Sequence, residues 1–592
     1  MNQKGRRPVS YASVALDIPT RAIDAAYDYL VPDGLAATAT VGATVLVPFS
    51  GRDVVGYVMD VHEEPPAGVA PGRVRPVTQV LAEPAFDGAA ARVARWMAAE
   101  YACPLCEAVR PFLAPGQKVR VTRASADAPW QLVSEKAGPV DERWVGLAPA
   151  ANDYAPGQRA SRQRAVLEAL REGPQRVAEL SATIPGAASA VTALAKRGVV
   201  EVFSRRSVRG SEATSLSSAA APRPERLTAG QVEALAAIDA AREEAAGGVV
   251  LVDGVTGSGK TEVYLDAIER ALAAGRGAIV LVPEISLTAQ TVGRFRSRFG
   301  EDVAVLHSRL STGERFDQWD LVRRGQAHVV VGARSALFAP LADPGLIIID
   351  EEHEASYKQD SSPRYHAREV AARMAAERGC ALVLGSATPS LESLARCRAG
   401  HFLGRPWTRV SMPERPAGAV LPKVTIVDMA EQFRGGGRGV FSAPLAHALE
   451  GVCERREKAV LLLNRRGFAN FLMCRECGCV PECPHCSCAL TYHERTHSLM
   501  CHTCGRAWPV RAYPDPSTCC PNCGSRYMGA YGVGTQRVED ELHALLPEGV
   551  EVIRMDADTT RTKGAHQRLL EQFDAAECAV LVGTQMIAKG LD

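Results

Sequence analysis

The chain has 592 residues, too many for one hydrophobic core, and this length indicates roughly three to five domains. Its hydrophobic share of 46% and charged share of 23% are ordinary for a water-soluble protein, and no run of about 18 apolar residues is present, which excludes a membrane span. Lys and Arg number 68 against 67 Asp and Glu, so the net charge of +1 excludes nucleic-acid binding through bulk charge and restricts it to local patches.

Residues 1–115 begin with short alternating apolar segments broken by Gly and Pro, which predicts a β-rich domain that ends in a helix. Residues 120–206 then carry helical stretches followed by a short β segment, the pattern of a winged helix. Some winged helices bind DNA, whereas others mediate only protein contacts. Residues 207–226 are rich in Ser, Ala and Pro without periodicity, which predicts a linker.

From residue 227 onward, short Val- and Ile-rich runs alternate with helical segments, which is typical of buried parallel strands joined by helices. We expect an α/β motor core made of two lobes, residues 227–440 and residues 441–592. A cysteine-rich insert at residues 473–525 interrupts the second lobe.

The segment after the first of these strands matches the phosphate-loop pattern G-x-x-x-x-G-K-[ST] and precedes a helical stretch, the context that the motif requires. Its glycines let backbone N–H groups surround phosphates, Lys260 reaches the β- and γ-phosphates, and the Thr261 hydroxyl ligates Mg²⁺. The sequence therefore predicts an ATP site with Mg²⁺. Its residues are Gly254, Thr256, Gly257, Ser258, Gly259, Lys260 and Thr261.

A later strand ends in the acidic sequence Asp-Glu-Glu-His, which starts at Asp350. Asp350 is predicted to hold Mg²⁺ through water and Glu351 to polarise the attacking water, so both join Lys260 and Thr261 as catalytic residues. Gln231, upstream of the phosphate loop, is predicted to read the adenine edge with its amide. The alternative for Gln231 is a surface glutamine at the start of a helix.

Aromatic and cationic residues alternate just beyond the acidic sequence, a composition that suits base stacking and phosphate contact. The predicted DNA-binding residues in this stretch are Tyr357, Lys358, Arg364 and Tyr365, and a loop without ligand contacts is the alternative. In the second lobe, Arg465 and Arg466 are expected to face phosphate, and residues 583–590 resemble a DNA-coupling motif.

Four CxxC pairs occupy the insert, and two such pairs complete a tetrahedral zinc–sulfur site. Eight cysteines therefore suit two Zn²⁺ ions that stabilise the fold and leave no open position for catalysis. Spacing alone leaves three pairings of the four units open. Eleven of the 17 cysteines lie in this segment, which indicates a reducing, cytoplasmic compartment. The pairs are Cys474/Cys477, Cys483/Cys486, Cys501/Cys504 and Cys520/Cys523.

These motifs in this order resemble a superfamily 2 helicase, and DEEHEASYKQ, LLLNRRGFA, the CPHC-containing insert and GTQMIAKG narrow the resemblance to the bacterial PriA (primosomal protein N′) family. The resemblance runs from about residue 10 to residue 592. It implies two RecA-like lobes and an ATP-dependent 3′→5′ DNA helicase that recognises stalled or repaired replication forks and initiates replication restart. It also implies primosome proteins, the replicative helicase and single-strand-binding protein as partners, with no role for a membrane.

The resemblance assigns roles that the residues alone leave open. It implies that residues 1–115 bind the 3′ end of DNA, with Asp28 bonding the terminal hydroxyl and Tyr27 and Tyr29 flanking the base. It also implies that the outer CxxC pairs share one zinc and the inner pairs the other. The first zinc then takes Cys474, Cys477, Cys520 and Cys523, and the second takes Cys483, Cys486, Cys501 and Cys504.

The sequence departs from the family in two places. Ser50 follows Pro48-Phe49 where the family often carries glycine, which bears on the shape of the 3′-end pocket. The chain ends at Asp592, inside the GTQMIAKGLD block and before the motif that supplies arginine fingers, so we expect a fragment of a longer protein with an incomplete second lobe. The alternative function is a non-catalytic platform for fork binding and primosome assembly.

Overall fold

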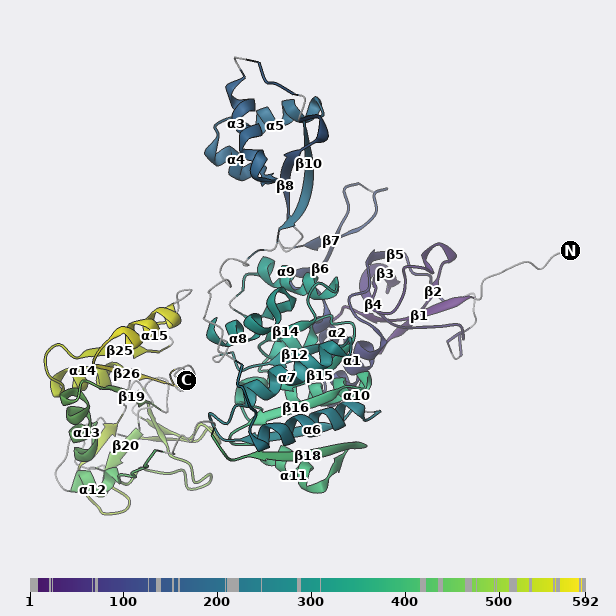
Figure 1. Cartoon of the computed structure of the whole chain (residues 1–592). Helices are drawn as coiled ribbons and strands as arrows, with labels where there is room; N and C mark the ends of the chain where they lie inside the picture. The colour runs from purple at the N-terminus through teal and green to yellow at the C-terminus, as the bar shows by residue number, and fades with distance from the viewer. Residues whose placement is uncertain are drawn as a thin grey trace. The chain divides into compact units, whose positions relative to one another are not determined.

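The computed structural model consists of two units, residues 1–418 and residues 419–592 (Figure 1). The described residues are all except 1–8, 21, 22, 24, 67, 70–72, 126, 135–139, 152, 153, 158, 159, 208, 210–222, 246, 285–288, 309, 416–421, 435–439, 464–470, 475, 494, 495, 497, 511–518, 532–534, 557, 558, 561–564, 585, 586 and 588–592.

The first unit opens with a five-stranded antiparallel sheet in the order β2-β1-β4-β3-β5. A two-residue turn joins β3 to β4, and both of its residues, Ser50 (φ 49°) and Gly51 (φ 81°), have positive φ, as a type I′ hairpin requires. A family glycine at position 50 would adopt this conformation without the strain that serine carries. The strands are β1 (Ser10–Leu16), β2 (Tyr27–Val31), β3 (Thr44–Phe49), β4 (Arg52–His62) and β5 (Gln79–Ala82).

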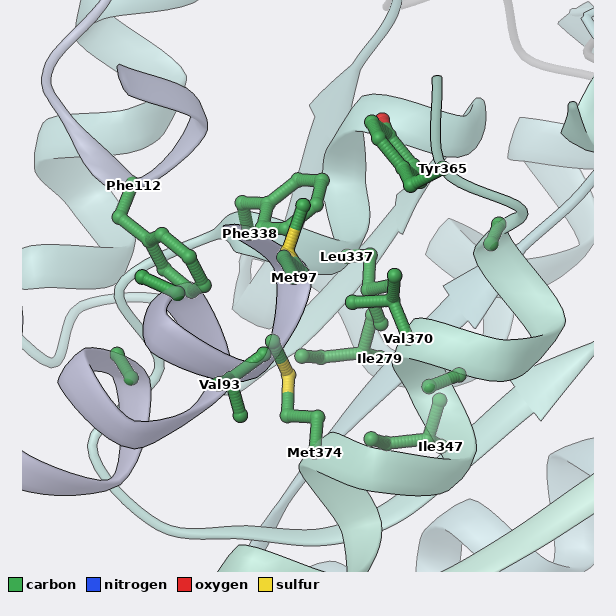
Figure 2. Packing of buried hydrophobic residues seen from close by; sticks show 14 of the residues in the cluster. Val93, Met97, Phe112, Ile279, Leu337, Phe338, Ile347, Tyr365, Val370 and Met374 are labelled. Atoms are coloured by element: carbon green, nitrogen blue, oxygen red, sulfur yellow. The ribbon is translucent and has the colours of Figure 1, made fainter. Parts of the chain in front are cut away.

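Helices α1 (Gly88–Glu100) and α2 (Leu105–Val109) follow this sheet and pack in the same hydrophobic cluster as strands from the middle of the chain. Figure 2 shows Met97 and Phe112 facing Phe338 and Met374. The rings of Phe112 and Phe338 meet edge to face, with centroids 4.9 Å apart. The N-terminal region therefore supplies part of the core of the lobe that follows it.

The next segment contains a hairpin and a small mixed module. The hairpin contains residue 120, where the winged helix was expected to start. It contacts the N-terminal sheet, because Gln79 of β5 exchanges hydrogen bonds of 2.9 and 3.0 Å with the backbone of Trp130. The module has three helices and a three-stranded antiparallel sheet in the order β10-β8-β9. The elements are β6 (Gln117–Thr122), β7 (Gln131–Ser134), β8 (Val140–Leu147), α3 (Ser161–Ala169), β9 (Gln175–Arg176), α4 (Val177–Thr183), α5 (Ala187–Lys196) and β10 (Val200–Ser207).

An eight-stranded sheet in the order β13-β14-β12-β15-β16-β11-β18-β17 forms the centre of the first unit, and all its neighbouring strands are parallel except β17 and β18. Successive residues of β11 alternate between two cores, with Leu251 in one cluster and Val250 in the other. Both faces are therefore buried, which explains the continuous apolar strand sequences. The strands are β11 (Val249–Gly254), β12 (Gly277–Leu281), β13 (Val303–Leu306), β14 (Val329–Gly332), β15 (Pro344–Ile349), β16 (Ala381–Ser386), β17 (His401–Phe402) and β18 (Arg405–Met412).

One helix, α6, precedes the first strand of this sheet, and five helices connect its strands. Helices α6 and α7 contribute to the cluster on one face, and α10 contributes to the cluster on the other face together with α1 and α2. The helices are α6 (Ala229–Glu243), α7 (Lys260–Ala273), α8 (Ala289–Phe299), α9 (Thr312–Arg323), α10 (Ala367–Arg378) and α11 (Leu391–Ala399).

The second unit combines a three-stranded parallel sheet, in the order β19-β26-β25, with a cysteine-rich segment of short antiparallel strands. Its elements are α12 (Met429–Arg434), α13 (Ala443–Glu454), β19 (Lys458–Leu462), β20 (Phe471–Cys474), β21 (Thr491–His493), β22 (Ser498–Met500), β23 (Ala507–Pro509), β24 (Met528–Tyr531), α14 (Thr535–Leu545), β25 (Glu551–Met555), α15 (Ala565–Ala575) and β26 (Ala579–Gly583). The expected α/β core with an N-terminal β-rich region and a cysteine-rich insert is confirmed.

Within the part of the chain that the structure describes, no helix combines the length and the apolar character needed to cross a bilayer.

Candidate functional site

The phosphate loop joins the end of β11 to the start of α7. Gly257 (φ 78°) and Gly259 (φ 83°) both hold left-handed backbone, which glycine adopts without strain. Lys260 begins the helix, and its Nζ donates to the Gly254 carbonyl at 2.8 Å. The lysine ammonium therefore lies over the loop, next to the helix N-terminus, where an anion is favoured.

The loop also contains a buried polar atom that suits a phosphate. Ser258 is 1% exposed and its Oγ has no hydrogen-bond partner in the structure. A Cβ on Gly254 would lie 2.6 Å from this Oγ, so only glycine fits there. An unsatisfied buried hydroxyl costs about 1–3 kcal/mol, which a bound phosphate oxygen would offset. The loop residues thus fit the nucleotide that the sequence predicts.

Gln231 is buried at the start of α6, which excludes the alternative of a surface glutamine, and its reading of the adenine edge stays a prediction. The residue is 3% exposed, and its Oε1 accepts from the Thr228 N–H in a capping box that starts α6. Its Nε2 donates to the Gly259 carbonyl of the phosphate loop at 3.3 Å. Both ends of the amide are therefore engaged, and the side chain supports the loop.

Asp350 follows β15 and is tied to the phosphate-loop helix. Tyr264 of α7 donates from its hydroxyl to Asp350 Oδ1 at 2.9 Å. Burial, and secondarily the neighbouring Glu351, raises the pKa of Asp350 to about 6. A divalent cation at this carboxylate would favour its ionised form. The bond from Tyr264 brings the two predicted catalytic segments together in one lobe.

Glu351 and His353 lie beside this carboxylate. Glu351 has a positive φ of 48°, which is uncommon for a residue other than glycine and is found at functional sites. His353 Nδ1 lies 3.5 Å from Glu351 Oε2 and 2.8 Å from the Ser386 Oγ at the end of β16. The acidic sequence is thus connected to the next strand end through the imidazole.

Glu352 has a different role from its neighbours because its side chain is fully buried. It accepts from Arg368 Nη1 at 2.7 Å, from the Ser390 backbone N–H at 2.6 Å and from the Ser393 Oγ at 3.0 Å. Removing one partner of such a buried pair costs about 3–5 kcal/mol. Glu352 therefore joins the acidic sequence firmly to the starts of α10 and α11.

The prediction that Tyr357 and Tyr365 stack on DNA bases is wrong for this structure. Tyr357 is 1% exposed, and its hydroxyl lies 2.7 Å from the Asp350 carbonyl. Tyr365 is 2% exposed and meets Phe338 edge to face at 5.2 Å. Both rings belong to the core of the lobe and have no face available for a base.

The two cations of the same loop do lie at the surface. Lys358 and Arg364 are exposed, and Lys358 Nζ donates to the Arg364 carbonyl. The Lys358 ammonium also lies 5.3 Å from the ring centroid of Tyr101 in the N-terminal region. Contact of these cations with DNA phosphate stays a prediction.

A pocket of about 850 Å³ lies against β2 in the N-terminal sheet, and Asp28 is one of its lining residues. Asp28 Oδ1 accepts from the Ser13 Oγ at 2.5 Å and lies 3.3 Å from His62 Nε2. No described residue donates to Asp28 Oδ2. The other lining residues include three arginines, Arg52, Arg73 and Arg75. A carboxylate acceptor and several cations in one pocket suit a ligand with both hydroxyl and phosphate groups.

The two tyrosines beside Asp28 differ in exposure. Tyr27 is half-buried and meets Phe49 edge to face at 5.3 Å. Tyr29 is 4% exposed, its hydroxyl donates to the Pro48 carbonyl at 3.2 Å, and burial raises its pKa to about 12. Tyr27 and Tyr29 both line the pocket, although most of the Tyr29 ring is held in the sheet core, and the expectation that the two rings flank a base stays a prediction.

The eight cysteines of the CxxC pairs gather into two groups, in the outer and inner sets given above. Within each group the four thiol sulfurs lie within 4.8 Å of one another. The closest sulfur pairs are 3.5 Å apart in the first group, and Cys483 and Cys504 are 3.8 Å apart in the second. Sulfurs at the corners of a tetrahedron around zinc, with bonds of about 2.3 Å, would be about 3.8 Å apart. The thiols therefore fit two structural zinc ions.

Each CxxC pair is held by the same backbone turn. In all four turns the first cysteine donates its N–H to the carbonyl five residues later, at 2.7–2.9 Å, and accepts from the N–H four residues later. That fourth residue has positive φ in every case: Gly478, Ser487, Gly505 and Gly524. The short spacing with a following residue in left-handed backbone, glycine in three of the four turns, thus directs both sulfurs of a pair toward one point.

Some predicted residues of the second lobe lie outside the described part of the chain. Arg465 and Arg466 are among them, as is most of residues 583–590. Of that last motif the structure describes Gly583, Thr584 and Ile587, and the Thr584 side chain is buried.

Sequence reasoning missed Tyr264, Arg368 and Cys488. Tyr264 stands four residues after Lys260, one helical turn on, so its position beside the loop could have been found from helix periodicity. Nothing in the sequence signals that Arg368 pairs with Glu352. Cys488 lies outside the four CxxC pairs, and its thiol lies beside the second group.

Comparisons with known proteins match three segments of the chain to family models. Residues 13–114 match the family model for a 3′ DNA-binding domain (3′BD), residues 228–397 the DEAD/DEAH box helicase model, and residues 483–509 the model for the PriA DNA helicase Cys-rich region. The replication restart protein PriA of Bacillus subtilis is 38% identical, with 99% of this chain and 77% of the relative covered. That of Synechocystis is 35% identical, with 98% and 76% covered. Among solved structures, the DEAD-box helicase Mss116 bound to single-stranded RNA matches with a TM-score of 0.37 at 12% identity, over 62% of each chain.

Proposed function

The chain belongs to the PriA family of replication restart proteins, and from this premise we propose that it is an ATP-dependent 3′→5′ DNA helicase that recognises replication forks through their 3′ ends. The main support for an ATP-driven motor is the hydrogen bond from Tyr264 to Asp350. This bond joins the helix that follows the phosphate loop to the acidic strand end. One lobe then holds both halves of a nucleotide site.

In this proposal each residue of the nucleotide site has one task. Lys260 exchanges its bond to the Gly254 carbonyl for the β- and γ-phosphates, and Thr261 and Asp350 hold Mg²⁺. When bound, Mg²⁺ neutralises charge on the phosphate oxygens. Glu351 orients the attacking water, and His353 links Glu351 to Ser386 so that changes at the nucleotide reach the next strand end.

The direction of travel is tested with a long single strand that carries a short annealed oligonucleotide at each end. A 3′→5′ motor that loads on the central single-stranded region releases the oligonucleotide at the 5′ end of the long strand, and only with ATP. Glu351→Gln, which binds DNA but does not orient water, should release neither. Release from the 3′ end instead would refute the polarity. DNA binding without any release would favour the fork-binding platform.

Fork recognition is proposed to depend on Asp28 and the pocket around it. The Asp28 carboxylate accepts a hydrogen bond from the terminal 3′-OH, and Arg52, Arg73 and Arg75 provide charge for the adjoining phosphates. This use of the pocket is supported by the match of residues 13–114 to the 3′ DNA-binding domain. Primosome proteins, the replicative helicase and single-strand-binding protein are the proposed partners, in the cytoplasm.

Asp28→Asn is expected to weaken the preference for forks with a 3′-OH over forks with a blocking 3′-phosphate by about tenfold, because a hydrogen bond to a charged acceptor becomes a neutral one. Fluorescence anisotropy with the two forks measures this ratio. Asp60→Asn is the matched control, since Asp60 is an exposed carboxylate in the same sheet, opposite Ser13 on β4. An unchanged ratio in Asp28→Asn, or an equal change in both variants, would contradict the role of Asp28.

A further inference from the structure

The second thiol group has a fifth sulfur beside it. Cys488 belongs to neither set of four, yet its Sγ lies 3.4 Å from Cys501 Sγ and 3.5 Å from Thr503 Oγ1. The ligand thiols of the two groups are no closer to one another in the contacts that the structure gives, at 3.5 Å in the first group and 3.8 Å in the second. A spare thiol therefore stands in contact with a sulfur that zinc requires.

The turn of the first CxxC pair in this group determines where Cys488 lies. Cys483 donates its N–H to the Cys488 carbonyl at 2.8 Å, so Cys488 closes the turn that holds Cys483 and Cys486. In the two trailing turns of the insert, Arg506 and Ser525 occupy the corresponding position. The backbone that directs the ligands thus also holds the extra sulfur near them.

Four thiolates complete a tetrahedral zinc site and leave no position for a fifth. Cys488 therefore keeps a reactive sulfur while its neighbour Cys501 serves as a ligand, and the partial exposure of Cys488 admits a small oxidant. We propose that Cys488 and Cys501 form a peroxide-sensitive pair whose oxidation to a disulfide releases the zinc of this group. The redox chemistry of this pair goes beyond the helicase function.

The reaction balances with a hydroperoxide as the oxidant. The Cys488 sulfur attacks the O–O bond of hydrogen peroxide, which yields a sulfenic acid at Cys488 and one water. The Cys501 sulfur then attacks the Cys488 sulfur, the S–S bond forms, the S–O bond breaks, and the departing hydroxide takes a proton to give a second water. One thiol, one zinc-bound thiolate, one peroxide and one proton from solvent become one disulfide and two waters, and zinc is left with three of its four sulfur ligands.

One backbone feature makes this group the easier of the two to open. Its leading turn carries Ser487 at positive φ (50°), where the other three turns carry glycine. Left-handed backbone is less favourable for a residue with a side chain than for glycine. The turn that holds Cys483 and Cys486 is therefore strained, and losing one ligand of the group meets less resistance there.

The test uses the full chain in a Cys479→Ser background, because Cys479 also lies near a thiol of the first group, Cys520. The comparison is Cys479→Ser against Cys479→Ser/Cys488→Ser, with Cys479→Ser/Cys519→Ser as control because Cys519 is an exposed cysteine outside both groups. Each protein must first contain two zinc ions by elemental analysis. Hydrogen peroxide is then added, a chromogenic chelator follows zinc release, and peptide mass spectrometry identifies disulfides.

Cys479→Ser and the Cys519 control are expected to lose one of their two zinc ions and to form the Cys488–Cys501 disulfide, while the Cys488 variant keeps both ions under the same exposure. Reduction with added zinc should restore the metal content. The proposal is overturned if the Cys488 variant loses zinc as fast as its parent, or if the disulfide joins any other pair of cysteines.

Discussion

Replacing Lys260 with alanine is expected to lower the DNA-stimulated ATP hydrolysis of this chain by about a hundred- to a thousandfold, the usual effect of removing one preorganised electrostatic contact from a transition state. Lys260 is 9% exposed and stands at the N-terminus of α7, where its ammonium donates to the Gly254 carbonyl. No other cation begins this helix, so the charge that builds on the transferring phosphate would lose its nearest counterpart.

The measurement is phosphate release with and without forked DNA. Arg270→Ala is the matched control, because it removes a cation from the last turn of the same helix, where the side chain is 44% exposed and pairs with Asp239. Hydrolysis in Lys260→Ala at the rate of this control would contradict the assignment of the phosphate loop. If the unsubstituted chain itself binds forks but hydrolyses no ATP, the fork-binding platform is the better description.

The sequence was informative where chemistry requires a fixed spacing. A phosphate loop needs its glycines and lysine at set positions between a strand and a helix, and the structure has β11 and α7 there. Strands that are buried on both faces need continuous apolar residues, so their existence could also be predicted. The CxxC spacing predicted that the thiols lie close together, although the choice among the three pairings of the four CxxC units came from the family resemblance.

The sequence was misleading in a loop where residue types do not distinguish buried positions from exposed positions. Tyr357 and Tyr365 alternate with cations as stacking residues would, but no periodicity in a loop tells which way a ring points, and both rings are buried. The contact of α1 with α10 could not be foreseen either, because an apolar helix face does not identify what covers it. The helix-capping role of Gln231 could have been predicted, because Thr228, three residues earlier, completes the capping-box sequence pattern with it.

Removing the metal from the full chain is expected to unfold the cysteine-rich segment while the eight-stranded lobe stays folded. Cysteines make up about half of the small hydrophobic cluster of this segment, and its larger side chains include Leu472, Tyr492 and Met528. So small a core cannot offset the conformational entropy of the segment, whereas structural zinc contributes about 10–16 kcal/mol. Elemental analysis before chelation should give two zinc ions per chain, and hydrogen exchange after chelation should show protection lost from residues 471–531 only.

Single cysteine substitutions test whether each set of four cysteines binds one zinc ion. Cys474→Ser and Cys483→Ser should each lower the content to one zinc ion per chain, because each cysteine belongs to a different group. Cys519→Ser should keep two ions, because Cys519 is exposed and outside both groups. A starting content of one or none would refute the two-site arrangement. Loss of both ions from either single variant would mean instead that the two groups fold as one cooperative unit, because β20 pairs with β24 directly beside Cys474 and joins both ends of the segment.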